Sequence, residues 1–124
     1  MLISVSYPCI RRIIMTFGQA VAEGRKEKKL SQKQLASMIL KEDGTPISPQ
    51  YLNDIERDRR NPPGEYLINQ FAKILEVPEE YFYFLANEIP PKYRSVSPNN
   101  PAQVQEAFKA FARSYRKGEG GQKR

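Results

Sequence analysis

The sequence of 124 residues contains no histidine, no tryptophan and a single cysteine. Without histidine, the chain lacks the commonest general base and the commonest metal ligand. A single cysteine excludes an intrachain disulfide framework and every cysteine-based zinc finger. A glycine-rich phosphate loop and a cluster of metal-ligating residues are also missing from the sequence. We therefore expect neither an enzyme nor a cofactor.

Long apolar runs are missing as well, since no segment approaches the roughly 20 apolar residues of a membrane-spanning helix. Residues 1–14 are apolar but make a poor signal peptide, because Pro8 interrupts them and Arg11 and Arg12 follow the apolar part. We expect this stretch to be an upstream extension, or else an arm that packs on the domain or on a partner chain. Cys9 lies in it and is expected to be a bystander thiol. The expected location is the cytoplasm, without a membrane partner.

Charge is abundant, with 20 Lys and Arg side chains against 14 Asp and Glu, and a net charge of +6. A basic balance favours an anionic partner, of which nucleic acid is the leading candidate. The excess is unevenly placed, since residues 15–86 carry 10 basic and 11 acidic side chains and residues 87–124 carry 8 basic and 3 acidic. Evidence for nucleic-acid binding in the larger segment must therefore come from the arrangement of its charges.

Proline and glycine divide the chain into short segments with helical periodicity and almost no alternating pattern. Their apolar faces are Leu30, Leu35, Met38 and Ile39; Leu52 and Ile55; Leu67, Phe71, Ile74 and Leu75; and Tyr81, Phe82 and Leu85. The pattern predicts helices over 17–29, 31–40, 48–57, 64–76, 78–86 and 101–116. We therefore expect an all-α protein with a helical domain at 15–86, a Pro-rich linker at 87–100, and a C-terminal helix with a basic tail at 101–124.

Capping residues support several of these helix starts. Ser31 with Gln34 three residues later forms the pattern of a capping box. Ser48 before Pro49 is a helix N-cap followed by proline at the first helical position, where no N–H is needed. Asn100, which also precedes a proline, repeats this pattern for the last helix.

The segment expected to be helical over 48–57 is the strongest candidate for recognition. Its polar side chains lie opposite Leu52 and Ile55, and three arginines follow; together they are Gln50, Asn53, Asp54, Arg57, Arg59 and Arg60. Glutamine and asparagine amides make paired hydrogen bonds to adenine in the major groove, and arginines suit phosphate. From this pattern alone, an ordinary solvated helix followed by a basic loop remains the alternative.

Several short motifs follow one another along residues 17–86. They are Leu30-Ser31-Gln32 with Leu35-Ala36, then Ile47 to Leu52 with Ile55-Glu56-Arg57, then Asn61-Pro62, and then the run from Leu67 to Leu85 that includes Ala72, Leu75, Val77 and Pro78. In this order they resemble the phage-repressor and Cro-like helix-turn-helix family, the XRE family. The resemblance implies a lambda-repressor-like five-helix DNA-binding domain, here followed by one more helix, and double-stranded DNA as the partner.

The resemblance also implies a role for individual residues. Base-reading positions are Gln50, Asn53 and Asp54, and Asp54 would accept a hydrogen bond from a cytosine amino group. Tyr51 and Arg57 resemble DNA-backbone positions, and Gln32 resembles one that contacts a backbone phosphate and supports the recognition helix. The neighbouring basic side chains Lys33, Arg59 and Arg60 suit phosphate by their charge. Pro49 stands where several relatives carry a base-contacting glutamine, so readout there would be by shape or by methyl contact. Arg25 and Glu56 resemble a buried ion pair between the first helix and the recognition helix; two solvated charges are the alternative.

The connection between the two motif helices departs from the family pattern. Residues 41–46 lengthen it by about six residues, with an extra turn of the preceding helix and a small loop as the expected form. A neutral surface insertion is cheap in loop entropy; the alternative is an added DNA-backbone or partner contact from Lys41 and Thr45. A lysine patch at the start of the motif would aid non-specific attraction to DNA: Lys26, Lys28, Lys29 and Lys33.

Two apolar features remain. The aromatic run Tyr81 to Phe84 could stack single-stranded bases, but we expect it to divide between core and dimer contacts. The last helix carries an apolar stripe at spacings of four, three and four residues, formed by Val104, Phe108, Phe111 and Tyr115. Such a stripe needs a partner surface, either on its own domain or on a second subunit.

We therefore expect a sequence-specific transcriptional regulator, a repressor that binds a palindromic operator as a homodimer. The alternative is an antitoxin-like or adaptor module of the same fold whose main ligand is another protein.

Overall fold

The computed structural model describes residues 15–94 and 100–123, so the expectations for residues 1–14, Cys9 included, lie outside the described residues. The described chain contains helices and no strand, which confirms an all-α fold. The elements are α1 (Phe17–Glu27), α2 (Gln32–Met38), α3 (Pro49–Glu56), α4 (Glu65–Leu75), α5 (Glu79–Leu85), the 3-10 helix η2 (Pro91–Tyr93) and α6 (Pro101–Lys123). No helix among these residues has the length and apolar character needed to cross a membrane.

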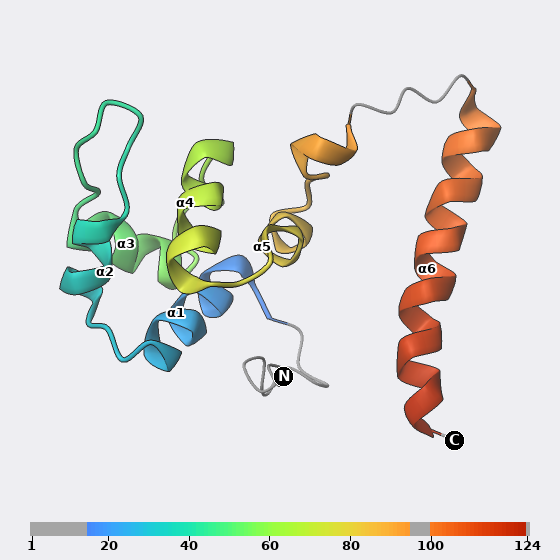
Figure 1. Ribbon diagram of the computed structural model, residues 1–124, viewed down its shortest axis with the longest axis horizontal. Coiled ribbons are helices and arrows are strands. Elements are labelled where there is room, and N and C mark those ends of the chain that lie inside the picture. The colour runs from blue at the N-terminus through green and yellow to red at the C-terminus, as the bar shows by residue number, and fades with distance from the viewer. Residues whose placement is uncertain (1–14, 95–99, 124) are drawn as a thin grey trace. The chain divides into compact units, whose positions relative to one another are not determined.

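The chain divides into two compact units, the first ending at Pro90 and the second beginning at Pro91. The first unit holds α1 to α5, the five helices expected for the domain (Figure 1). The second holds η2, which the sequence did not predict, and α6.

Helices α2 and α3 start at the expected side-chain caps. Ser31 accepts a hydrogen bond from the Gln34 N–H, and the Gln34 side chain accepts one from the Ser31 N–H, which confirms the capping box. Ser48 caps α3 with a single hydrogen bond, accepted from the Tyr51 N–H, and Pro49 stands at the first helical position. A second capping box, formed by Thr16 and Gln19, starts α1 and was not predicted. These bonds satisfy N–H groups that have no partner inside the helix.

The core of the first unit is built around α1, which packs against α3, α4 and α5. The centroid of the Phe17 ring lies 6.4 Å from that of Phe71 on α4, with the two rings nearly perpendicular. It lies 5.4 Å from the centroid of the Phe82 ring on α5. Val21, Leu35 and the other fully buried side chains complete this core. Burial of a side chain of this kind stabilises the fold by about 1.5–3 kcal/mol.

Three details of the predicted apolar faces are corrected. Helix α2 ends at Met38, whose side chain is exposed, and Ile39 is buried from an extended backbone. On α4, Ile68 is fully buried although the sequence pattern omitted it. Tyr83 is also fully buried, because its hydroxyl donates a hydrogen bond to Asn69 Oδ1 at 2.8 Å and so has a partner inside the core.

The aromatic run at 81–84 divides between the core and the surface. Phe82 and Tyr83 are buried, Tyr81 is half-buried and Phe84 is exposed. The run therefore presents no continuous row of rings on which bases could stack.

The insertion at 41–46 forms a small hairpin instead of the expected extra turn of helix. The Lys41 N–H donates to the Thr45 carbonyl at 2.7 Å, the Gly44 N–H donates to the Lys41 carbonyl at 2.8 Å, and Leu40 pairs with Pro46 in an antiparallel bridge. Gly44 takes a positive φ of 90°, which suits glycine in a tight turn. Figure 1 shows this hairpin projecting beyond α2 and α3.

In the second unit, α6 extends to Lys123, beyond the predicted end at residue 116. Asn100 Oδ1 accepts a hydrogen bond from the Gln103 N–H at 2.8 Å, which confirms the expected cap. The rings of the apolar stripe are exposed, and those of Phe111 and Tyr115 stack at 6.2 Å. The stripe thus forms a regular apolar face along the helix.

Candidate nucleic-acid interface

A buried network sets the position of α3 against α1 and α2. The Arg25 guanidinium donates to both carboxylate oxygens of Glu56, with distances of 2.7 Å for Nε–Oε2 and 3.0 Å for Nη2–Oε1. Arg25 also donates to the Leu30 carbonyl at 2.9 Å, and Gln32 Nε2 donates to Glu56 Oε1 at 2.8 Å. The Glu56 side chain is 5% exposed. This bidentate geometry makes a strong, directional link between the three helices.

A second link, which the sequence pattern did not predict, joins the start of α1 to Asp58, two residues beyond the end of α3. Asp58 accepts hydrogen bonds from the Thr16 hydroxyl at 2.6 Å and from the Gly18 N–H at 3.1 Å. It adopts a left-handed backbone with φ of 58°. A side chain at position 18 would overlap the Ile55 carbonyl oxygen. Gly18, one of the two glycines inside α1, was the available signal, since a glycine inside a helical pattern can mark a packing constraint.

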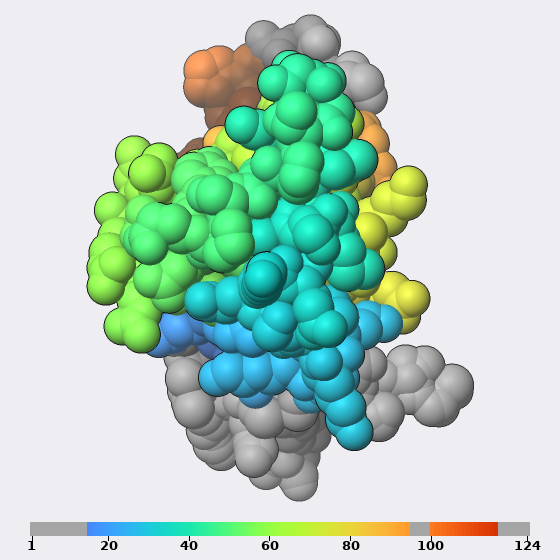
Figure 2. Space-filling model, turned by 90° about the vertical axis from the view of Figure 1, so that its left-hand side faces the viewer, coloured from blue at the N-terminus to red at the C-terminus, as the bar shows by residue number. Residues whose placement is uncertain are grey.

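These links leave the polar side of α3 facing outward. Gln50 is exposed, whereas Asn53 and Asp54 are half-buried. Figure 2 shows the face on which α2, in cyan, the hairpin, in teal, and α3 with the following loop, in green, come to the surface together. The base-reading candidates therefore lie on one exposed helix, as major-groove recognition requires.

Asn53 and Gln32 are paired with each other. Gln32 Nε2 donates to Asn53 Oδ1 at 3.2 Å as well as to Glu56, so both of its N–H groups have partners within the protein. Asn53 Oδ1 also accepts from Arg57 Nε at 3.3 Å. The Asn53 amide nitrogen, a donor, is therefore the part of that side chain suited to a base. The Gln32 side chain supports α3 through this pairing.

Asp54 is at the centre of a charged cluster. Its Oδ1 accepts from Gln50 Nε2 at 3.0 Å and from Arg59 Nη1 at 3.3 Å, and its Oδ2 lies 3.8 Å from Arg60 Nη2. The Arg60 guanidinium lies over the Tyr51 ring, 4.7 Å from its centroid, in a cation–π contact. Three of the predicted site residues, Gln50, Arg59 and Arg60, thus surround this carboxylate, and Tyr51 joins them through Arg60.

The remaining basic candidates lie at the surface of the same unit. Lys33 and Arg57 are exposed, as are Lys26 and Lys29. Lys28 is engaged elsewhere, since its Nζ lies 2.6 Å from Glu76 Oε1. The lysine patch is therefore available to an anion except at Lys28.

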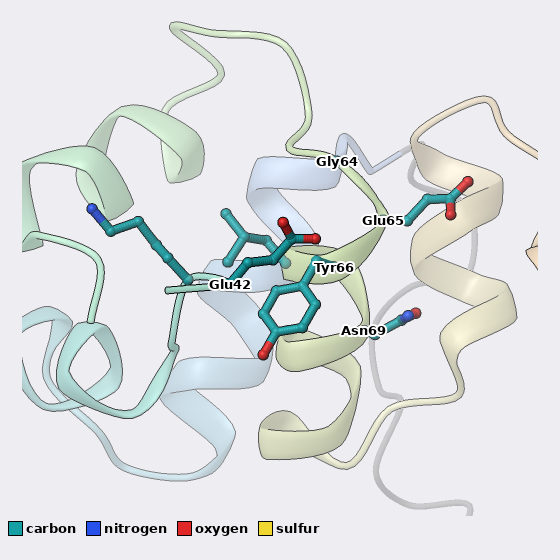
Figure 3. Close-up of a pocket in the computed structure, with 7 residues that line it drawn as sticks. Glu42, Gly64, Glu65, Tyr66 and Asn69 are labelled. Carbon is teal, nitrogen blue, oxygen red and sulfur yellow. The ribbon is translucent and has the colours of Figure 1, made fainter. Parts of the chain in front are cut away.

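A shallow hollow of about 600 Å³ lies between the hairpin and the start of α4. Tyr66 and Glu42 line it, as Figure 3 shows, together with Lys41, Gly64, Glu65, Leu67 and Asn69. The described residues contain no group of acidic or cysteine side chains arranged to hold a metal ion. The lining of the hollow is a mixed polar and apolar surface.

Comparison with known proteins gives one match. A family model described as helix-turn-helix matches residues 21–82, half of the chain, and these residues include α2, α3 and the link between them. No curated protein and no solved structure gives a match.

Proposed function

Because the chain belongs to the XRE-like helix-turn-helix family of DNA-binding transcriptional regulators, we propose that it acts as a repressor that binds a palindromic operator as a homodimer. The observation that carries the proposal is the exposed polar side of α3, which the Arg25–Glu56 and Asp58 links hold in a fixed position. In this family's docking mode, α3 enters the major groove and α2 lies across the backbone.

Within this proposal, Gln50 and Asn53 contact base edges. Lys33, Tyr51, Arg57, Arg59 and Arg60 contact phosphates, which set the register of the protein on the duplex without reading sequence. Two subunits would place their α3 helices in successive major grooves, about 34 Å apart. The apolar stripe of α6 is the proposed contact between subunits, and occupation of a promoter would cause repression.

The test is selection of bound duplexes from a random pool, followed by affinity measurements at a fixed salt concentration. We expect a palindromic consensus with half-sites one helical turn apart. Gln50→Ala should cost about 1–3 kcal/mol at one base pair and leave the other positions unchanged. An equal loss on every duplex would assign Gln50 to the backbone and contradict its proposed role.

One observation favours a second function, in which the domain also binds another protein. Leu40 and Tyr66 are exposed, and the Leu40 N–H donates to the side chain of Gln70, one helical turn after Tyr66. With the neighbouring hollow they form a partly apolar surface on the hairpin side of α4. A stable equimolar complex that is lost on Tyr66→Ala, with duplex binding retained, would establish this function.

A further inference from the structure

The hydrogen bond between Gln50 and Asp54 determines what the recognition helix can read. The two residues lie one turn apart on α3, and Gln50 Nε2 donates to Asp54 Oδ1 at 3.0 Å. Arg59 and Arg60 approach the same carboxylate from the following loop, at 3.3 and 3.8 Å. The Asp54 side chain is 20% exposed. The carboxylate is therefore held by Gln50 on the helix and by the two arginines in the loop that follows it.

This contact fixes which way the Gln50 amide faces. An ionised carboxylate only accepts hydrogen bonds, so the Gln50 nitrogen, and not its oxygen, must point toward Asp54. One of the two Nε2 hydrogens is used in this bond. The amide retains one N–H donor and one carbonyl acceptor for a base.

The remaining pair of groups matches one purine and conflicts with the other. In the major groove, adenine presents the N7 acceptor beside the N6 amino donor, whereas guanine presents two acceptors, N7 and O6. One donor and one acceptor therefore fit adenine. At guanine, the Gln50 oxygen would face O6, and the second hydrogen that guanine needs is already bound to Asp54.

We propose that Asp54 is a specificity-determining residue that acts through Gln50 and makes it select adenine over guanine. The inference rests on the proposed function, since it assigns the base read within the DNA site. It replaces the direct contact between Asp54 and cytosine expected from the sequence, because both carboxylate oxygens face groups of the protein itself.

The experiment compares duplexes that carry each of the four base pairs at the position where Gln50→Ala loses discrimination. Wild type should prefer adenine over guanine by about 5- to 150-fold. Asp54→Ala should bring this ratio close to one, mainly through tighter binding to guanine, since Gln50 can then donate two hydrogen bonds. Asp54→Asn retains an oxygen acceptor for Gln50 Nε2 and should keep the preference for adenine.

Two controls separate this role from a structural one. Lys33→Ala removes a proposed phosphate contact that is not among the groups around Asp54, so it should weaken binding to both duplexes while leaving their ratio unchanged. In the free protein, the side-chain amide resonances of Gln50 should shift in Asp54→Ala and return toward the wild-type position in Asp54→Asn, which requires no DNA.

The proposal is overturned if Asp54→Ala changes the preference at another base pair, or if wild type prefers guanine at the Gln50 position. It is also overturned if Asp54→Ala weakens all duplexes equally. A wild-type protein that binds no duplex in the pool would instead overturn the proposed function, and this inference with it.

Discussion

The Arg25 guanidinium and the Glu56 carboxylate form two parallel hydrogen bonds, of 2.7 and 3.0 Å, with the Glu56 side chain 5% exposed. The pair joins α1 to the last residue of α3. Because α3 carries the base-reading candidates, the same contact that stabilises the domain also sets the orientation of α3 against α1.

Removing one member of this pair should be costly. Glu56→Ala leaves the Arg25 charge and the Gln32 amide without their partner, and we expect a loss of about 3–5 kcal/mol in the free energy of unfolding, measured in urea. Lys28→Ala is the matched control, because the Lys28–Glu76 pair is exposed and should contribute less than about 1 kcal/mol. Equal costs for the two variants would show that burial does not strengthen the first pair.

A side chain at position 18 should also disrupt the domain. In Gly18→Ala the new methyl group would overlap the Ile55 carbonyl oxygen and approach Asp58 Oδ1, so the link between α1 and the end of α3 must open. We expect a destabilisation of about 1–3 kcal/mol by thermal and urea unfolding. Gly64 is the N-cap of α4 and has open space around it. Because serine is a better N-cap than glycine, Gly64→Ser should instead raise the free energy of unfolding by about 0.5 kcal/mol or less.

The pKa of Asp43 should lie below its ordinary value, because the Thr45 hydroxyl and the Thr45 N–H both donate to its carboxylate. Because the pKa is lower in the folded state than in the unfolded state, the ionised Asp43 side chain stabilises the hairpin at pH values above the unfolded-state pKa. This stabilisation is lost as the pH falls through the folded-state pKa. The window therefore lies in acid, below about pH 4. NMR titration of the Asp43 carboxyl carbon should show the lowered pKa, and Thr45→Val should raise it by removing the hydroxyl donor.

Much of this architecture was predictable because its determinants are local in the sequence. The Ser31 and Ser48 caps follow from residue types at fixed spacing. The Arg25–Glu56 pair, whose members are 31 residues apart, is not local and was expected only from the family resemblance. The end of α2 at Met38 was not predicted, because the apolar periodicity continues past it. The Ile47 N–H donates to the Ile39 carbonyl at 3.0 Å, and that hairpin contact keeps Ile39 extended.

The surroundings of Asp54 show a second limit. The pattern placed Asp54 opposite Leu52 and Ile55, and its side chain is half-buried there, but its partners Arg59 and Arg60 come from the loop beyond the helix. That loop turns back at Asp58, whose left-handed backbone is held by the start of α1, some 40 residues earlier. A helical pattern alone contains no information about such a contact.

Salt dependence should separate phosphate contacts from base contacts. The logarithm of the association constant should fall with the logarithm of salt concentration by about 0.9 for each phosphate contact. Lys33→Ala should reduce this slope by about one contact and weaken all duplexes equally. Lys73→Ala, which removes the same charge outside the proposed site, should change neither the slope nor the affinity at moderate salt.

The apolar stripe of α6 should hold two subunits together. Phe108 lies in the middle of this exposed stripe, so Phe108→Glu places a charge where a second helix would pack, and we expect a monomer by analytical ultracentrifugation in place of a wild-type dimer. Ala110→Glu introduces the same charge on another side of α6 and should leave the dimer intact. Because a dimer engages both half-sites at once, the monomer should bind a palindromic duplex about 100-fold more weakly or worse, yet bind a single half-site normally. Truncation after Pro98 should reproduce this loss. A truncated chain that keeps both its dimeric state and its affinity would exclude α6 as the contact between subunits.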